Sequence, residues 1–157
     1  MTSIKRRIFL KGSLATGAVG MAVSTGLLAP RMSFAAWSKA AFDATEVSAA
    51  MSALYGSSDA EGSDKIKIKA PDIAENGAVV PVSVKADIDG VESIALLAEG
   101  NGTPLVATFM MGAGALPDVS TRIKMGKTAD VIAVVKAGGK LYQAQKEVKV
   151  TIGGCGG

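Results

Sequence analysis

The chain contains one cysteine, Cys155, and two glycines stand on each side of it: Gly153 and Gly154 before, Gly156 and Gly157 after. Glycine has no Cβ and reaches backbone conformations closed to other residues, so residues 153–157 are expected to form a flexible arm. No bulky neighbour in the sequence shields the sulfur. The pattern predicts a thiol carried on a short, thin segment, where its reactivity depends on how much of it is thiolate.

Several other chemistries are excluded by composition. The 157 residues include no histidine, the usual general base and commonest metal ligand. With one cysteine as well, the chain alone cannot assemble a zinc, haem or iron–sulfur ligand set, nor a Ser-His-Asp or Cys-His nucleophile. We therefore expect no metal, no cofactor and no catalytic residues, and interpret the protein as something other than an enzyme.

The elements that must position the thiol begin with an export leader. The stretch 5–11 reads Lys-Arg-Arg-Ile-Phe-Leu-Lys, and its pair Arg6 and Arg7 resembles the twin-arginine export motif. A Gly/Ala-rich apolar run follows, and residues 33–35 read Ser-Phe-Ala, a signal-peptidase pattern. We predict a signal peptide at 1–35 that is cleaved, and a periplasmic location. An ordinary secretory signal and a retained membrane anchor are the alternatives.

The charge is divided between this leader and the rest of the chain. Residues 1–35 carry five basic residues and no acid, which leaves twelve basic and fourteen acidic residues from residue 36 onward. That balance gives no general electrostatic reason to bind nucleic acid or, after cleavage, a membrane. In an oxidising compartment structural cysteines come in pairs, so a single exported cysteine needs its own explanation.

Residues 36–152 are expected to form one domain, a short N-terminal helix followed by a β-sandwich. Residues 37–42 are a short apolar segment, and apolar residues at 47, 50, 51 and 54 predict one helical face, with Gly56 as the C-terminal cap. Residues 57–63 are expected to be a polar linker and 71–77 to contain turns. From residue 65 the hydrophobic period becomes two, and about seven strands follow, typical of a sandwich. The run 131–135 indicates a strand covered on both faces, and 141–152 predicts a long last strand that leads into the arm.

The ending of the chain, Val-Lys-Val-Thr-Ile-Gly-Gly-Cys-Gly-Gly at 148–157, resembles the C-terminus of the SoxY family, the sulfur-carrier subunits of the thiosulfate-oxidising Sox system. Three internal stretches resemble the same family: Ala-Pro-Asp-Ile-Ala-Glu-Asn-Gly at 70–77, Pro-Leu-Val-Ala-Thr-Phe at 104–109, and Ser-Thr-Arg-Ile-Lys at 120–124. The GGCGG ending is the most specific part of the resemblance.

The resemblance implies an immunoglobulin-like sandwich that forms a heterodimer with a second small β protein, SoxZ, which would be exported as a passenger of the leader. It implies that Cys155 is the covalent attachment site for sulfur. A haem-containing enzyme would load the cysteine with thiosulfate. A sulfate-releasing hydrolase and a sulfane dehydrogenase would then act on the adduct in turn.

Other functions remain open from the residues alone. The protein could be an exported structural or interaction sandwich whose tail cysteine forms intermolecular disulfides. A Gly-Gly terminus activated as a thiocarboxylate, as in ubiquitin-like sulfur carriers, would need cytoplasmic ATP-dependent chemistry, and the leader argues against it. The predicted apolar helical face at 47, 50, 51 and 54 also suggests a second hypothesis, that the helix and a face of the sheet bury against SoxZ.

Overall fold

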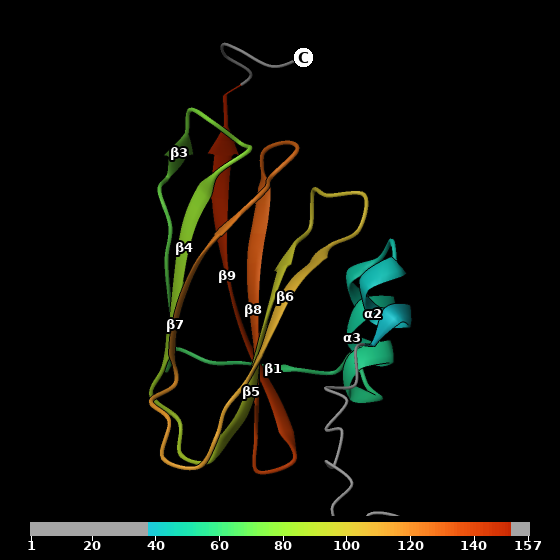
Figure 1. Cartoon of the computed structure of the whole chain (residues 1–157), viewed down its shortest axis with the longest axis vertical. Helices are drawn as coiled ribbons and strands as arrows, with labels where there is room; N and C mark the ends of the chain where they lie inside the picture. Colours follow the sequence, from blue (N-terminus) through green and yellow to red (C-terminus); the bar gives the residue numbers. More distant parts are fainter. Residues whose placement is uncertain (1–37, 152–157) are drawn as a thin grey trace, which may run out of the picture. The chain divides into compact units, whose positions relative to one another are not determined.

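The computed structural model describes residues 38–151, which belong to one compact unit that begins at Ser38 (Figure 1). The described residues begin with two helices, α2 (Lys39–Asp43) and α3 (Val47–Tyr55). Nine strands follow in the described part of the chain: β1 (Glu61–Gly62), β2 (Ile66–Lys69), β3 (Ile73–Ala74), β4 (Val80–Ala86), β5 (Val91–Ala98), β6 (Leu105–Met110), β7 (Asp118–Ile123), β8 (Ala129–Ala137) and β9 (Lys140–Val150).

The strands form two sheets. The larger has the order β1-β9-β8-β5-β6, with β3 also paired to β9, and the smaller has the order β2-β4-β7. Seven strands have four residues or more, and their partition matches an immunoglobulin sandwich: β2, β4 and β7 take the places of strands A, B and E, and β9, β8, β5 and β6 those of G, F, C and C′. The predicted all-β sandwich with a helical start is confirmed.

The main core lies between the two sheets. Alternate residues of β4 point into it, and Val80, Val82 and Val84 are each at most 1% exposed. They meet apolar side chains of β5 and β8 such as Leu96 and Val131. Burying each such side chain contributes about 1.5–3 kcal/mol, so this core is the main source of the domain's stability.

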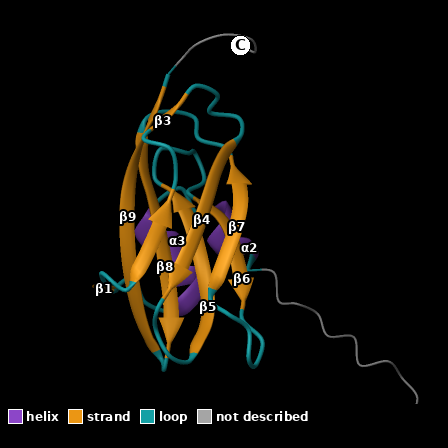
Figure 2. Cartoon of the chain, turned by 90° about the vertical axis from the view of Figure 1, so that its left-hand side faces the viewer, coloured by secondary structure: helices purple, strands orange, loops and turns teal. Residues whose placement is uncertain are grey.

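A second core lies on the outer face of the large sheet, where both helices pack. Ala41 of α2 and Met51 of α3 are buried against Leu97 and Val134. This explains why β5 and β8 read as continuous apolar runs, because one face meets the small sheet and the other meets the helices. The prediction that residues 131–135 form a strand covered on both faces is confirmed. The small sheet lies in front in Figure 2, with the helices behind the large sheet.

Helix α3 ends as predicted. Gly56 adopts a left-handed conformation with φ of 81°, and its N–H donates to the carbonyl of Ser52 at 2.9 Å. The apolar face of α3 is used within the chain, since Ala50 and Met51 are buried against its own sheet. The apolar face of α3 therefore gives no reason to infer a partner. The hypothesis that the helix buries against SoxZ no longer has an observation that supports it.

Three short elements differ from the sequence prediction. The apolar segment 37–42 overlaps helix α2, which runs to Asp43 and packs on the sheet through Ala41. The expected linker 57–63 contains β1, and the expected turn region 71–77 contains β3. Both two-residue strands run parallel to β9, which pairs Glu61 with Tyr142 and Ile73 with Lys149. Their extended conformation is imposed by the edge of β9, because two residues are too few to show a period.

Candidate functional site at the end of the last strand

The predicted site residues of the arm, Cys155 and the glycines at 153, 154, 156 and 157, lie outside the described residues, as do Arg6, Arg7 and the rest of the predicted leader. The structure describes the point from which the arm continues. Strand β9 ends at Val150, and Thr151 is the last described residue. We call Val150 and Thr151 the arm root.

On one edge, β3 holds the arm root. Ala74 is the register partner of Val150, and the N–H of Thr151 donates to the Ala74 carbonyl at 3.1 Å. One step earlier, the N–H of Lys149 donates to the carbonyl of Asp72 at 3.0 Å. The last residues of β9 therefore have a paired neighbour although β1 pairs only with the first part of this edge.

On the other edge, the arm root is held by a side chain. Strand β8 begins at Ala129, which pairs with Val148, so the backbone ladder stops two residues before the end of β9. The hydroxyl of Thr128 continues it, because Oγ1 accepts a hydrogen bond from the N–H of Val150 at 2.9 Å. Val150 is thus fixed from both sides.

A glycine allows two loops to meet beside the arm root. The carbonyl of Gly77 accepts a hydrogen bond of 2.7 Å from the N–H of Met125, which joins the β3–β4 connection to the β7–β8 connection. A Cβ at position 77 would lie 2.4 Å from the Met125 carbonyl oxygen and 2.8 Å from Cγ1 of Val150. Only glycine fits here without a shift of the backbone.

Lys146 fastens the chain segment that leads into β3. Its ammonium donates to the carbonyl of Ala70 at 2.7 Å and lies 3.0 Å from Oδ1 of Asp72. Because Lys146 belongs to β9 itself, the same strand that carries the arm also holds its covering strand in place. The Lys146 side chain is 32% exposed and that of Asp72 is 89% exposed, so the hydrogen bond to the carbonyl is the better protected of the two contacts.

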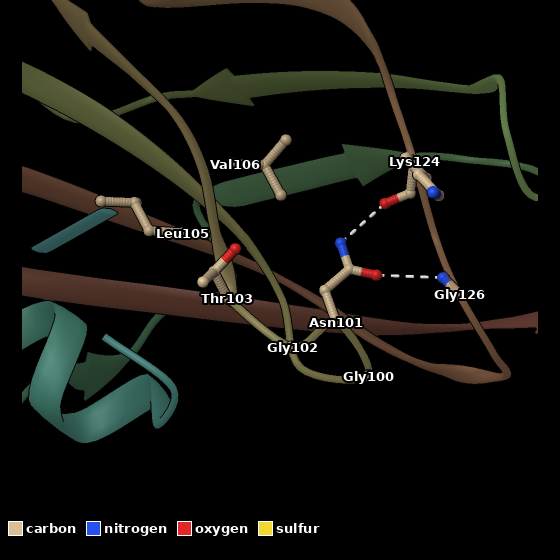
Figure 3. A pocket seen from close by; sticks show the side chains of 8 residues that line it. All are labelled: Gly100, Asn101, Gly102, Thr103, Leu105, Val106, Lys124 and Gly126. Carbon is tan, nitrogen blue, oxygen red and sulfur yellow. Dashed lines mark hydrogen bonds between the residues drawn. The ribbon is translucent and has the colours of Figure 1, made fainter. Parts of the chain in front are cut away.

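A hollow of about 580 Å³ opens at the same end of the sandwich, between the β5–β6 turn and the β7–β8 connection (Figure 3). The side chain of Asn101 joins the two loops: its Nδ2 donates to the carbonyl of Lys124 at 2.8 Å, and its Oδ1 accepts from the N–H of Gly126 at 3.0 Å. The lining includes glycines, Thr103 and Lys124. It offers one cation and no carboxylate, so it has no acid–base pair for catalysis.

Tyr55 and Glu92, whose surroundings shift their pKa, lie away from the arm root. Burial raises the pKa of the Tyr55 hydroxyl, and a hydrogen bond with Ser93 offsets part of that effect. A hydrogen bond from Lys136 lowers the pKa of Glu92, helped by the backbone N–H of Gly139. Glu92 lies at the start of β5, and Tyr55, at the end of α3, contacts Ser93 of the same strand. The start of β5 is at the opposite end of the strands from Val150.

Neither a metal site nor a membrane span is found in the described part of the chain. Residues 38–151 contain no group of three or more His, Cys, Asp or Glu side chains that could hold a metal ion. No helix among them is long and apolar enough to cross a membrane.

The sequence predicts Cys155 as the site, a prediction that the described residues do not test, and it does not predict what holds the arm root. Ile73 and Ala74 lie in a stretch rich in turn residues, and Thr128 has no distinctive neighbours. One usable signal is Gly77, because a glycine at the end of the predicted turn region 71–77 can mark a close backbone approach.

Comparison with known proteins assigns the family. The family model described as "Sulfur oxidation protein SoxY" matches residues 51–155, a stretch that ends at the cysteine. The solved structure of the sulfur carrier protein SoxY from Chlorobium limicola f. thiosulfatophilum is 48% identical, with a TM-score of 0.60, and the match covers 66% of this chain and 94% of that one.

Two further comparisons add nothing to the assignment. A chain from a structure of T-cell activation by the bacterial superantigen toxic shock syndrome toxin-1 is 12% identical, with a TM-score of 0.38, over 55% of this chain and 99% of that one. Comparison with curated proteins gave no match. The family model and the Chlorobium structure agree, and the chain belongs to the SoxY family of sulfur oxidation proteins.

Proposed function

We propose that this protein is a periplasmic covalent sulfur carrier in thiosulfate oxidation, with Cys155 as its attachment site. The observation that carries the proposal is that the SoxY match ends at the single cysteine, four residues after the fixed backbone of Thr151. Four residues span at most about 14 Å, enough for a thin segment to enter the site of another protein while the sandwich stays outside.

The loading step balances as an oxidation. The Cys155 thiol and thiosulfate form a sulfur–sulfur bond, which yields a cysteine S-thiosulfonate, one proton and two electrons. A haem-containing partner enzyme takes the electrons. An ordinary thiol has a pKa near 8.5 and is mostly protonated at neutral pH, so we assign the activation of the sulfur to that enzyme.

The later steps use water and further partners. A hydrolase adds water to the S-thiosulfonate, releases sulfate and a proton, and leaves a persulfide on Cys155. A sulfane dehydrogenase then removes electrons from the outer sulfur while water supplies its oxygens. In each step this protein is the substrate that is held and passed on, so its role is that of a carrier and not of an enzyme.

An unprotected sheet edge supports a heterodimer with a SoxZ-type β protein. Among the described residues β6 pairs with β5 alone, and its sequence Leu-Val-Ala-Thr-Phe-Met contains no charge and no proline. The edge strands of the small sheet carry charges, such as Lys67 on β2 and Arg122 on β7, and the outer edge of β9 is paired by β1 and β3. Edges without such protection readily pair with another strand. We place the SoxZ-type partner along β6, with Met110, 78% exposed, at the end of its edge.

Intact-protein mass spectrometry tests the carrier function. Mature protein is incubated with thiosulfate and the haem-containing loading enzyme, and the expected product is wild-type protein with the mass of one S-thiosulfonate. Cys155→Ser should gain nothing. A matched control moves the thiol: Cys155→Ser with Ser58→Cys keeps one exposed cysteine but should also stay unloaded. An equal adduct on either variant, or none on the wild type, would refute the proposal.

The same spectra separate the carrier from a disulfide-linked structural protein. If the cysteine serves only intermolecular disulfides, the wild type gains the mass of a second chain and no sulfur adduct.

The partner edge is tested by titrating SoxZ against Met110→Lys, which should weaken heterodimer formation about tenfold or more. Val79→Lys, also at an exposed apolar residue but outside β6, is the control and should bind as the wild type does.

A further inference from the structure

The outer face of the small sheet carries a concentration of positive charge. The side chains that point away from the core on β2, β4 and β7 include four basic residues and one acid: Lys67, Lys69, Lys85, Arg122 and Asp118. From residue 36 onward the chain has fewer basic than acidic residues, so this face differs in sign from the molecule as a whole. Figure 2 looks onto this side, with β4 and β7 in front.

The pairing of these strands places like charges together. Lys67 is the register partner of Lys85 across β2 and β4, and no ion pair within 4.0 Å involves either one among residues 38–151. Asp64 and Asp87 line the same hollow as the two lysines without reaching that distance. Lys85 also faces Asp118 across β4 and β7, without an ion pair between them. Like charges directly opposite each other destabilise a sheet, so folding alone does not favour the Lys67–Lys85 pair.

The face is also uncovered and nearly flat at its centre. The helices cover the outer face of the large sheet, and no described element covers the outer face of the small one. At the centre of the face Ser83 and Ser120 are register partners, and the hydroxyl of Ser120 donates to that of Ser83 at 2.8 Å. Lys69 lies opposite Ser83 on β2, so the two small serines are flanked by basic side chains that a partner surface can reach.

We propose that the outer face of β2, β4 and β7 is a docking surface for an acidic face of a partner protein. Charge complementarity favours a partner with a compact acidic patch. Such a patch can contact the lysines of this face without approaching the negatively charged remainder of the chain. A nucleic acid or an anionic membrane extends past the face and is repelled by that remainder. The proposal rests on these charges alone and is independent of the chemistry of Cys155.

Binding of poly-L-glutamate by full mature protein at low ionic strength tests the proposal. Replacing Lys67, Lys69 and Lys85 together by Gln should weaken binding about tenfold, in line with three exposed charge pairs. The control replaces three exposed lysines elsewhere, Lys39, Lys127 and Lys140, by Gln and removes the same total charge. Equal loss in both triple variants, or no loss in the first, would overturn the proposal, because the attraction would then not lie on this face.

Two further measurements test whether the partner is a protein and whether Lys67 and Lys85 repel each other. Wild-type protein should bind duplex DNA and phosphatidylglycerol vesicles more weakly than poly-L-glutamate, and tighter binding to either would overturn the assignment to a protein. The single variant Lys67→Gln should unfold at a higher temperature than the wild type, because it relieves the repulsion with Lys85. A lower unfolding temperature would show that the pair is not strained and would remove the argument for a binding face.

Discussion

The hydroxyl of Thr128 accepts a hydrogen bond from the backbone N–H of Val150 at 2.9 Å, at the place where the β8–β9 ladder has already ended. One side chain thus continues the contact along β9 from Val148 to Val150, on the edge opposite to β3. The backbone of β9 is therefore held on both edges as far as Val150, close to the point from which the segment with Cys155 continues.

Removing this hydroxyl should loosen the arm root. Thr128→Val keeps the shape of the side chain and loses the acceptor, so the free energy of unfolding should fall by about 0.5–1.5 kcal/mol. Amide hydrogen exchange at Val150 should become about tenfold faster than in the wild type, a larger change than in the middle of β9. Thr128→Ser keeps the acceptor and should exchange at nearly the wild-type rate. Exchange at Val150 that is the same in all three proteins would mean that the bond does not hold the strand.

A side chain at position 77 should be poorly tolerated. Gly77→Ala places a methyl group 2.4 Å from the carbonyl oxygen of Met125, so the two loops must separate, at a cost of about 1–3 kcal/mol in the free energy of unfolding. Urea denaturation measures this loss. Gly112→Ala is the matched control: its methyl group would meet nothing within 4 Å, and its backbone is not left-handed. The control should be as stable as the wild type or slightly more so. Similar destabilisation by both substitutions would show that the close approach at Gly77 is not the cause.

The sequence predicted the parts of the fold that repeat a pattern. The apolar spacing of Ala50 and Met51 gave helix α3, and the run of β-branched residues around Val134 gave a strand covered on both faces. These predictions hold because each depends on many residues of one segment that face the same environment. The prediction of Cys155 as the attachment site rests on sequence alone, since its isolation and its glycine neighbours are features of the sequence and the residue lies outside the described part of the chain.

The arm root could not be predicted because it depends on contacts between distant segments. Ile73 and Ala74 are extended because they pair with Lys149 and Val150, more than seventy residues later. Glu61 and Gly62 have low strand propensity and take their conformation from the same strand. The role of Thr128 follows only once the end of the β8–β9 ladder is known. The conformation of such short elements is set by pairing with distant strands, and they are too short to show a hydrophobic period in the sequence.

Lys146 should matter through its hydrogen bond to Ala70 more than through its ion pair. Lys146→Met removes both contacts and should lower the free energy of unfolding by about 1 kcal/mol, while Asp72→Asn removes only an exposed ion pair and should cost less than about 0.5 kcal/mol. Urea denaturation at low and high salt separates the two, because only the ion pair is screened. If Asp72→Asn proves as costly as Lys146→Met, or if the whole effect of Lys146→Met disappears in salt, the covering strand is held by charge and the carbonyl contact is unimportant.

Glu92 should make the stability of the domain depend on pH in the acid range. Its carboxylate accepts hydrogen bonds from Lys136 and from the N–H of Gly139, and these lower its pKa below the ordinary value of 4.5. A carboxyl whose pKa is lower in the folded protein binds its proton more readily when unfolded. Its contribution is therefore fully present above about pH 4.5 and is lost as the pH falls through the folded-state pKa. Glu92→Gln should lack this part of the acid-induced loss, which urea midpoints measured from neutral pH down to about pH 3 would show. Asp89→Asn, in the β4–β5 connection and outside these contacts, is the matched control for removal of one carboxylate. If Glu92→Gln loses stability over the same pH range and by the same amount as the wild type, other carboxylates account for the acid dependence.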